Sequence, residues 1–166
     1  MAVVTDRLTL RIDAMANGGD GIARRDGKAV FVPGAIPGDV AEIEIVDAKK
    51  RFERGRLIAV TEPSPNRVDP PCRHFGTCGG CAWQHADYES QLEWKASTVA
   101  GQLRHLGGID QVDVRPILAP GEPYHYRNRI DLHVDRGRPA LVRGGSNELV
   151  PIDVCLLADE ALVELF

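Results

Sequence analysis

Three of the four cysteines in this chain lie within ten residues of one another, in the stretch CRHFGTCGGC. They are Cys72, Cys78 and Cys81, and 73 residues separate them from the fourth, Cys155. Four thiolates complete the coordination of a tetrahedral metal ion or of the four irons in a cubane iron–sulfur cluster. With three ligands in one loop and one in a distant segment, such a site would join separate parts of the fold. The spacing therefore predicts a four-cysteine metal site that staples the chain.

The spacing leaves both iron–sulfur and zinc open as the metal. Zinc sites made of four cysteines more often consist of two C-x2-C pairs, and here only Cys78 and Cys81 form one. Gly79 and Gly80 between them carry no Cβ atom, so backbone N–H groups can approach the sulfurs closely. That approach favours a cluster with inorganic sulfide over a bare ion.

Other chemistry of these cysteines finds less support in the sequence. The N-terminal stretch MAVVTDRLTL does not have the form of a signal peptide, and in a reducing cytoplasm clustered cysteines rarely form structural disulfides. A redox C-x-x-C at Cys78 and Cys81 would need a β-α-β context that the sequence lacks. His74 and His85 flank the cysteines and could replace a zinc ligand, although both also fit ordinary polar surface positions. No apolar run approaches the roughly 18 residues of a membrane helix, so we expect no membrane partner. The form of the N-terminus favours the cytoplasm, and we expect a monomer.

Basic residues gather in two places although the formal net charge is −4. The stretch KKRFERGR, residues 49–56, sets five cations against a single glutamate. The stretch YHYRNRIDLHVDRGRPALVR, residues 124–143, sets five arginines against two aspartates. Such patches can hold phosphate on a chain that is acidic overall, and an ordinary solvated surface is the alternative explanation.

The first 61 residues have the pattern of a small β-barrel. Five strand-like runs are separated by glycine-rich or charged turns: RLTLRIDAM, GIARR, KAVFVPG, DVAEIEIVDA and RGRLIAV. Five strands without a helical period predict an OB-like antiparallel barrel over residues 1–61. Residues 62–71 contain four prolines, which interrupt regular structure, so this segment is interpreted as a linker.

Residues 72–166 are predicted to form a small mixed domain around the cysteines, which makes the fold class α+β. An amphipathic helix of about five turns is expected before Gly107, because apolar residues recur at helical spacing; they are Tyr88, Leu92, Ala96, Val99, Leu103 and Leu106. Strand-like runs follow it: VDVRPIL, YRNRIDLHV, RPALVR and ELVPIDV. The final stretch, LLADEALVELF, reads as a helix that has barely begun, so we expect the chain to be a piece of a larger protein.

These residues resemble a known family. The stretch PPCRHFGTCGGCAWQHADYESQLEWK, with YRNR and with IDVC at Cys155, is similar to the central domain of bacterial RNA uracil-5 methyltransferases. The preceding GGDGIARRDGKAVFVPGAIPGDV resembles the TRAM domain that many of these enzymes carry at the N-terminus. The resemblance implies that Cys72, Cys78, Cys81 and Cys155 hold a [4Fe-4S] cluster. It also implies an RNA-binding barrel and S-adenosylmethionine-dependent methylation of uridine C5, with 23S rRNA as the expected target.

The resemblance also implies what this chain lacks. Methylation at C5 needs a cysteine nucleophile, a general base and a pocket for the methyl donor, and the family places these in a C-terminal domain. Here no G-x-G-x-x-G-like loop follows a strand, and all four cysteines are assigned to the cluster. We therefore expect no catalytic residue in this chain and no activity from it alone. S-adenosylmethionine would bind only to the full-length parent.

RNA recognition is then the expected task of the chain. Proteins read RNA largely through unpaired bases, which stack on aromatic or arginine planes. We expect RNA contacts from the first basic stretch at Lys49, Lys50, Arg51 and Phe52, although Phe52 also fits the barrel core. Arg127 and Arg129 alternate on a predicted strand beside the cluster, so they would share one face. Two alternatives remain, namely a stand-alone RNA-binding module with a structural metal and a ferredoxin-type electron carrier.

Overall fold

The computed structural model describes residues 6–119, 121–164 and 166. The chain divides into two compact units, one of residues 1–69 and 85–117 and the other of residues 70–84 and 118–166. Each unit is described by itself below. Within the described residues, no helix is long and apolar enough to cross a membrane.

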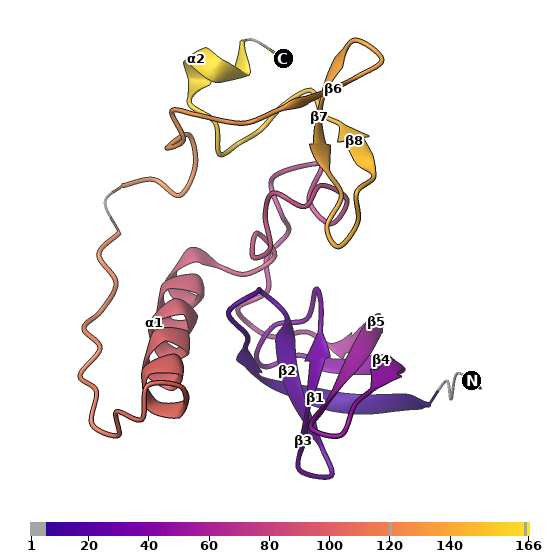
Figure 1. The fold of residues 1–166 in the computed structure, drawn as a ribbon, viewed down its shortest axis with the longest axis vertical. Coiled ribbons are helices and arrows are strands. Elements are labelled where there is room, and N and C mark those ends of the chain that lie inside the picture. The colour runs from indigo at the N-terminus through magenta and orange to yellow at the C-terminus, as the bar shows by residue number, and fades with distance from the viewer. Residues whose placement is uncertain (1–5, 120, 165) are drawn as a thin grey trace. The chain divides into compact units, whose positions relative to one another are not determined.

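The first unit is built on the predicted five-stranded barrel, which the structure confirms (Figure 1). Its strands are β1 (Arg7–Met15), β2 (Gly21–Arg25), β3 (Lys28–Val32), β4 (Val40–Ala48) and β5 (Phe52–Glu62). They close in the order β1-β2-β3-β5-β4, with β4 pairing back onto β1.

One strand pair corrects the expectation of a fully antiparallel barrel. β3 and β5 run parallel, with Ala29 opposite Phe52 and Phe31 opposite Arg54. The other four neighbouring pairs are antiparallel. Strand directions cannot alternate all the way round a closed ring with an odd number of strands, so a five-stranded barrel must contain at least one parallel pair.

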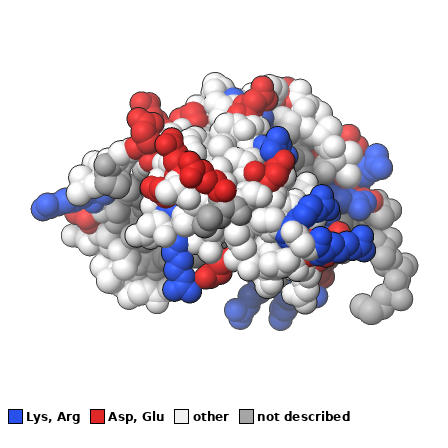
Figure 2. Space-filling model, turned by 90° about the horizontal axis from the view of Figure 1, so that it is seen from above, with Lys and Arg blue, Asp and Glu red and all other residues white. Residues whose placement is uncertain are grey.

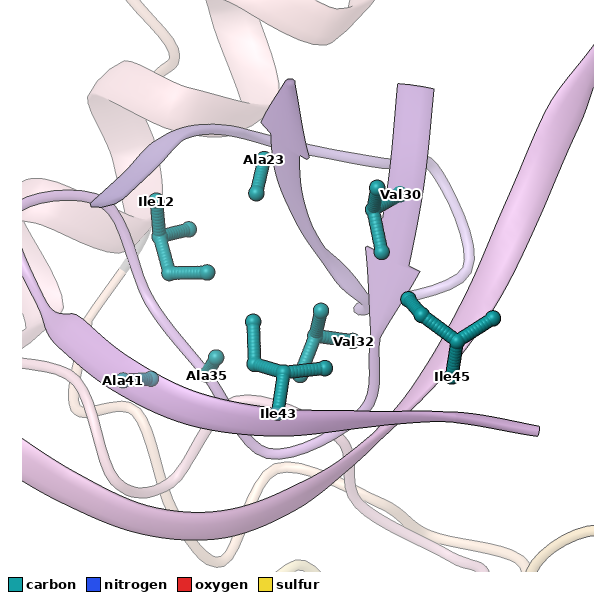
Figure 3. Close-up of a cluster of buried hydrophobic side chains, with 8 residues drawn as sticks. All are labelled: Ile12, Ala23, Val30, Val32, Ala35, Ala41, Ile43 and Ile45. Carbon is teal, nitrogen blue, oxygen red and sulfur yellow. The ribbon is translucent and has the colours of Figure 1, made fainter. Parts of the chain in front are cut away.

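The barrel core consists of small and β-branched apolar side chains that point inward from four strands and one loop (Figure 3). They are Ile12, Ala23, Val30, Val32, Ala35, Ala41, Ile43 and Ile45. A glycine on β5 is required for this packing, because a Cβ atom at Gly55 would lie 2.3 Å from the Cγ2 atom of Ile43. The period-two alternation of each strand thus produces one filled interior.

A buried carboxylate ties the barrel to the segment that follows it. Asp39 is fully buried, and its carboxylate accepts hydrogen bonds of 2.9 Å from the backbone N–H groups of Ile36 and Ser64. The Arg67 guanidinium donates to the same carboxylate, through Nε at 3.1 Å and through a second nitrogen. Burial by itself would raise the pKa of Asp39, but these hydrogen bonds together hold that pKa below its ordinary value.

The proline-rich segment predicted as a linker pairs with residues that follow the cysteines. Arg67 forms an isolated antiparallel bridge with Ala86. The Val68 N–H donates to the His85 carbonyl at 3.1 Å, and the Asp87 N–H donates to the Asn66 carbonyl at 2.9 Å. This part of the segment is therefore held in place by backbone hydrogen bonds.

The long helix α1 (Tyr88–His105) confirms the predicted helix. Asp87 caps its N-terminus by accepting a hydrogen bond from the Ser90 N–H at 2.9 Å. The apolar stripe of the helix is not buried, since Ser90 alone is buried among the helix residues and Val99 is 46% exposed. Helical spacing predicts which side chains share a face, but it does not supply a surface for that face to pack on.

The second unit contains a small antiparallel sheet of β6 (His133–Asp135), β7 (Arg138–Val142) and β8 (Leu149–Pro151), followed by the short helix α2 (Glu160–Val163). The runs RPALVR and ELVPIDV supply β7 and β8. The predicted strand over residues 112–118 is wrong, and the one over 126–134 is reduced to its last two residues. Alternating residues form a strand only where another backbone pairs with them.

The predicted domain boundaries of 1–61, 62–71 and 72–166 remain a prediction. The two compact units divide the chain differently, because residues 85–117 group with the barrel.

Candidate functional site

The four cysteines line one pocket of the second unit, with a volume of about 300 Å³. Cys72, Cys78 and Cys81 reach it from the loop before Gln84, and Cys155 reaches it from the segment after β8. All four are half-buried free thiols, not disulfides. Cys81 and Cys155, which have 73 residues between them in the sequence, therefore line the same pocket.

A close backbone contact explains the first glycine of the CGGC stretch. The Gly79 N–H donates to the Val142 carbonyl at the end of β7 at 2.9 Å. The backbone of Cys78 forms an isolated antiparallel β-bridge with that of Arg143. A Cβ atom at Gly79 would lie 2.8 Å from that carbonyl oxygen, so only glycine allows the loop to lie against β7. This role was missed at the sequence level, where nothing identifies Val142 as the neighbour.

The second glycine acts as the sequence predicts. The Gly80 N–H donates to the Sγ atom of Cys78 at 3.4 Å. Backbone donors to a thiolate sulfur stabilise its negative charge, and they do so in metal–thiolate sites.

Asp153 links the cysteine loop to the segment that carries Cys155. Its carboxylate accepts a hydrogen bond of 2.7 Å from the His74 Nε2 atom and one of 3.0 Å from the Arg73 Nε atom. Because these bonds hold the charged form, they lower the pKa of Asp153. Arg73 and Asp153 lie inside the CRHFGTCGGC and IDVC stretches, but no role was predicted for either residue.

The two flanking histidines have different surroundings. His74 lines the cysteine pocket while its Nε2 atom is engaged by Asp153. His85 belongs to the barrel unit and is buried there. Burial, and then the Arg67 charge, lower the pKa of His85 to about 4, so it is neutral at pH 7.

The electrostatics of the pocket disfavour four bare thiolates. Burial raises the pKa of the Cys81 thiol. A hydrogen bond from Gln84 lowers this pKa, while the charges of Cys155, Cys72 and Cys78 raise it. Thiolates brought this close repel one another, so a cationic group is needed for all four to ionise together.

The chemistry of the pocket's donor atoms fits a four-thiolate site. Four thiols line the pocket, and four thiolates are the ligand set of a structural zinc ion as well as of a [4Fe-4S] cluster. Over the described ranges 6–119, 121–164 and 166, however, no group of three or more His, Cys, Asp or Glu side chains is arranged to hold a single metal ion.

Arg127 and Arg129 also line this pocket, although they do not lie on a strand. Arg127 is held by its backbone, which accepts from the Asp159 N–H and donates to the Leu157 carbonyl, both at 2.8 Å. Its guanidinium lies 5.9 Å from the centroid of the Tyr126 ring. Arg129 pairs with the exposed Asp131 at 3.0 Å. The prediction that the two arginines act together on RNA stays a prediction.

The basic stretch of the barrel begins in the turn between β4 and β5, where Lys49, Lys50 and Arg51 are exposed, and continues into β5. The Lys49 Nζ atom forms an ion pair of 3.0 Å with Asp47. Phe52 begins β5 and is absent from the barrel core, so the alternative of a core aromatic is wrong. Its ring meets Phe31, a partner that the sequence analysis did not select. Figure 2 shows Lys and Arg side chains in separate groups interleaved with acidic ones.

Comparisons with known proteins agree with the barrel fold and show that the chain is similar to RNA methyltransferases. The TRAM domain family matches residues 4–58, which cover nearly all of the barrel. An uncharacterized RNA methyltransferase of Gloeobacter violaceus is 40% identical over 161 residues, which are 93% of this chain and 35% of that protein. A 23S rRNA (uracil(1939)-C(5))-methyltransferase of a Marinomonas species is 36% identical over 95% of this chain and 36% of its own length.

A solved structure covers both units. The tRNA (uracil-54, C5)-methyltransferase of Pyrococcus abyssi, in complex with S-adenosyl-L-homocysteine, is 29% identical with a TM-score of 0.54. The match covers 94% of this chain and 34% of that one. The chain thus spans about a third of the length of the relatives it matches.

Proposed function

We propose that this chain is the RNA-recognition and [4Fe-4S]-binding part of a TRAM-containing RNA uracil-5 methyltransferase. The observation that carries the proposal is the convergence of Cys72, Cys78, Cys81 and Cys155 on one pocket, within a chain of which 95% aligns with a 23S rRNA (uracil(1939)-C(5))-methyltransferase. The names of the relatives support 23S rRNA as the target.

The four cysteines would hold the cluster as its thiolate ligands. When bound, the cluster would join the loop of Cys72, Cys78 and Cys81 to the segment of Cys155, and so stabilise the second unit. Methyl transfer to a uridine exchanges no electrons, so the task of the cluster is structural. Asp153, Arg73 and His74 hold the same two segments together through hydrogen bonds and thereby position the ligands.

The barrel would contribute RNA binding, and the methyl-transfer residues would come from elsewhere in the enzyme. With every cysteine of the chain committed to the cluster, none is available as the nucleophile that adds to the base. We therefore propose that the chain alone is inactive and acts as a monomer in the cytoplasm. It would hold the RNA while the target uridine is turned out of its stack toward the catalytic domain.

Charge reversal in the β4–β5 turn tests the RNA-binding part of the proposal. Lys50→Glu with Arg51→Glu is expected to weaken binding to an rRNA fragment by about tenfold or more, because phosphate contacts dominate affinity. The slope of log affinity against log salt should also become shallower by about one for each phosphate that the variant no longer neutralises. Titrations at several salt concentrations measure both quantities.

The matched control applies the same change of charge on other elements, as Arg11→Glu with Arg104→Glu. Both residues are exposed and lie on β1 and α1. Equal losses in the two double variants would mean that only the overall charge matters, and unchanged binding in the turn variant would exclude this turn from the interface.

A further inference from the structure

An aromatic pair lies on the outer surface of the barrel, away from its core. On β3, Val30 and Val32 fill the core, so Phe31 between them points outward. On β5, the buried Glu53 points inward, and Phe52 and Arg54 on either side of it point outward. The rings of Phe31 and Phe52 meet edge to face, with centroids 5.8 Å apart and planes at 79°.

The parallel pairing of β3 with β5 places Phe31 and Phe52 next to basic residues on one part of the outer face, which we call the platform. Residues aligned across β2, β3 and β5 form two rows on the outer face, Arg24–Ala29–Phe52 and Ile22–Phe31–Arg54. The small Ala29 lies between Arg24 and Phe52, so no bulky side chain separates the cation from the ring. The Arg54 guanidinium lies 6.0 Å from the centroid of Phe52, in the range of a cation–π contact.

The same pairing brings two turns, each flanked by or containing basic residues, to one end of the barrel. β3 begins at Lys28 and β5 begins at Phe52, and because the strands run parallel from these residues, the turns before them lie at the same end. The β2–β3 turn follows Arg25, and the β4–β5 turn contains Lys50 and Arg51.

The ion pairs of this end divide its cations into two groups. Glu53 contacts Arg25 at 3.6 Å and Lys28 at 4.0 Å, and Asp47, which lies opposite Arg54 in the sheet, pairs with Lys49 at 3.0 Å. Arg25 also pairs with Asp6 and Asp26. Within the described part of the chain, four exposed cations here have no such partner: Arg24, Lys50, Arg51 and Arg54. These are the cations available to a ligand.

We propose that this outer face of β2, β3 and β5 binds unpaired RNA, with a base stacked against Phe52 and Phe31 and with phosphates held by the four cations. The inference rests on the proposed RNA-binding function and specifies its ligand. Half-buried aromatic rings on an outer face, flanked by exposed cations, complement a strand that offers bases and phosphates together. A duplex offers mainly phosphates, because its bases remain stacked inside.

The test compares single-stranded and double-stranded RNA on the full chain. The probes are a labelled oligouridylate of about ten nucleotides, within the span of one OB-like barrel, and an RNA duplex of the same length. Phe52→Leu keeps an apolar side chain but removes the ring, and Phe52→Tyr keeps the ring. We expect Phe52→Leu to weaken single-strand binding by about tenfold, with duplex binding and the salt slope unchanged. Phe52→Tyr should bind like the unmodified chain.

A second variant tests the same surface at an exposed position, where a substitution should not disturb folding. Arg54 is exposed, so Arg54→Gln is expected to leave the barrel intact. It should weaken single-strand binding several-fold and reduce the salt slope by about one. Unfolding in urea, followed by circular dichroism, checks that each variant is folded.

The outcomes separate this inference from the function on which it rests. If the chain binds RNA but Phe52→Leu and Arg54→Gln bind the single strand normally, the platform is wrong and the broader function stands. Equal losses on single-stranded and duplex RNA from Phe52→Leu would also overturn base stacking. A chain that binds neither probe would refute RNA recognition itself.

Discussion

Replacing Cys155 with serine is expected to abolish iron binding by this chain. The variant removes the one ligand that comes from the segment after β8, and a serine hydroxyl is a poor substitute for a thiolate toward iron. After anaerobic reconstitution, the iron content should fall from about four per chain to near zero, and the charge-transfer absorption of the cluster should disappear with it.

The same substitution has a structural readout. The backbone of Arg127 is hydrogen-bonded to Leu157 and Asp159, just beyond Cys155. If the cluster holds this segment in place, the amides of Arg127 and Asp159 should exchange with solvent faster in Cys155→Ser. Amides in the barrel core, such as that of Val30, should be unaffected because they belong to the other unit.

Thr77→Ser is the matched control for this experiment. Thr77 precedes Cys78 in the same loop but carries no thiol, so this variant should bind iron normally. A Cys155→Ser protein that loads about four irons with an unchanged spectrum would show that Cys155 is not a ligand.

Asp39→Ala is expected to lower the free energy of unfolding of the barrel unit by about 3–5 kcal/mol, the usual effect of breaking a buried ion pair. The variant leaves the Ile36 and Ser64 N–H groups without their acceptor and Arg67 without its counter-charge. Typical domains are stable by only about 5–15 kcal/mol, so the loss should be obvious in a urea titration followed by circular dichroism.

Glu42→Ala provides the comparison for Asp39→Ala. Glu42 pairs with Arg7 at 3.5 Å on the barrel surface, where side-chain exposures are 35% and 62%. An exposed pair of this kind contributes at most about 1 kcal/mol. Similar losses in the two variants would contradict the special role assigned to the buried carboxylate.

This network also predicts how stability depends on pH. The pKa of Asp39 is lowered in the folded state, so its contribution is present at neutral pH and is lost as the pH falls below about 4. The pKa of His85 is lowered to about 4 by burial, so the unfolded chain takes up a proton on this histidine first. Stability should therefore begin to decline below about pH 6.5.

The barrel was predictable because its signals are local. Val30 and Val32 alternate with outward residues, and each strand ends at a glycine-rich or charged turn. Closing five strands into a ring requires at least one parallel pair, but neither sequence stretch shows that this pair is β3 with β5. The helix was predictable for the same local reason, and its cap at Asp87 lies directly before the first periodic residue.

The orientation of Phe52 depends on contacts that the sequence does not reveal. A strand that alternates Phe, Glu and Arg would ordinarily place the aromatic ring inside. Here Glu53 takes the inward position, close to Arg25 and Lys28. Those cations come from a hairpin that lies more than twenty residues earlier in the chain, so only the closed barrel shows why the glutamate is tolerated there.

The four cysteines of the site were predictable, but the contacts that hold their two segments together were not. Spacing selected Cys72, Cys78, Cys81 and Cys155 as a set, and the structure brings them to one pocket. The clamp formed by Asp153 with Arg73 and His74, and the contact of Gly79 with β7, join segments that are far apart in the sequence. Such contacts become visible only when both segments have been placed.

Iron and acid-labile sulfide analysis of protein purified without oxygen, combined with an absorption spectrum, determines whether the four cysteines hold a [4Fe-4S] cluster. We expect about four irons and an equal amount of sulfide per chain, with a broad absorption band that disappears when the iron is chelated. One zinc ion per chain without sulfide would contradict this expectation, because four cysteines around a single ion would make the site a zinc staple.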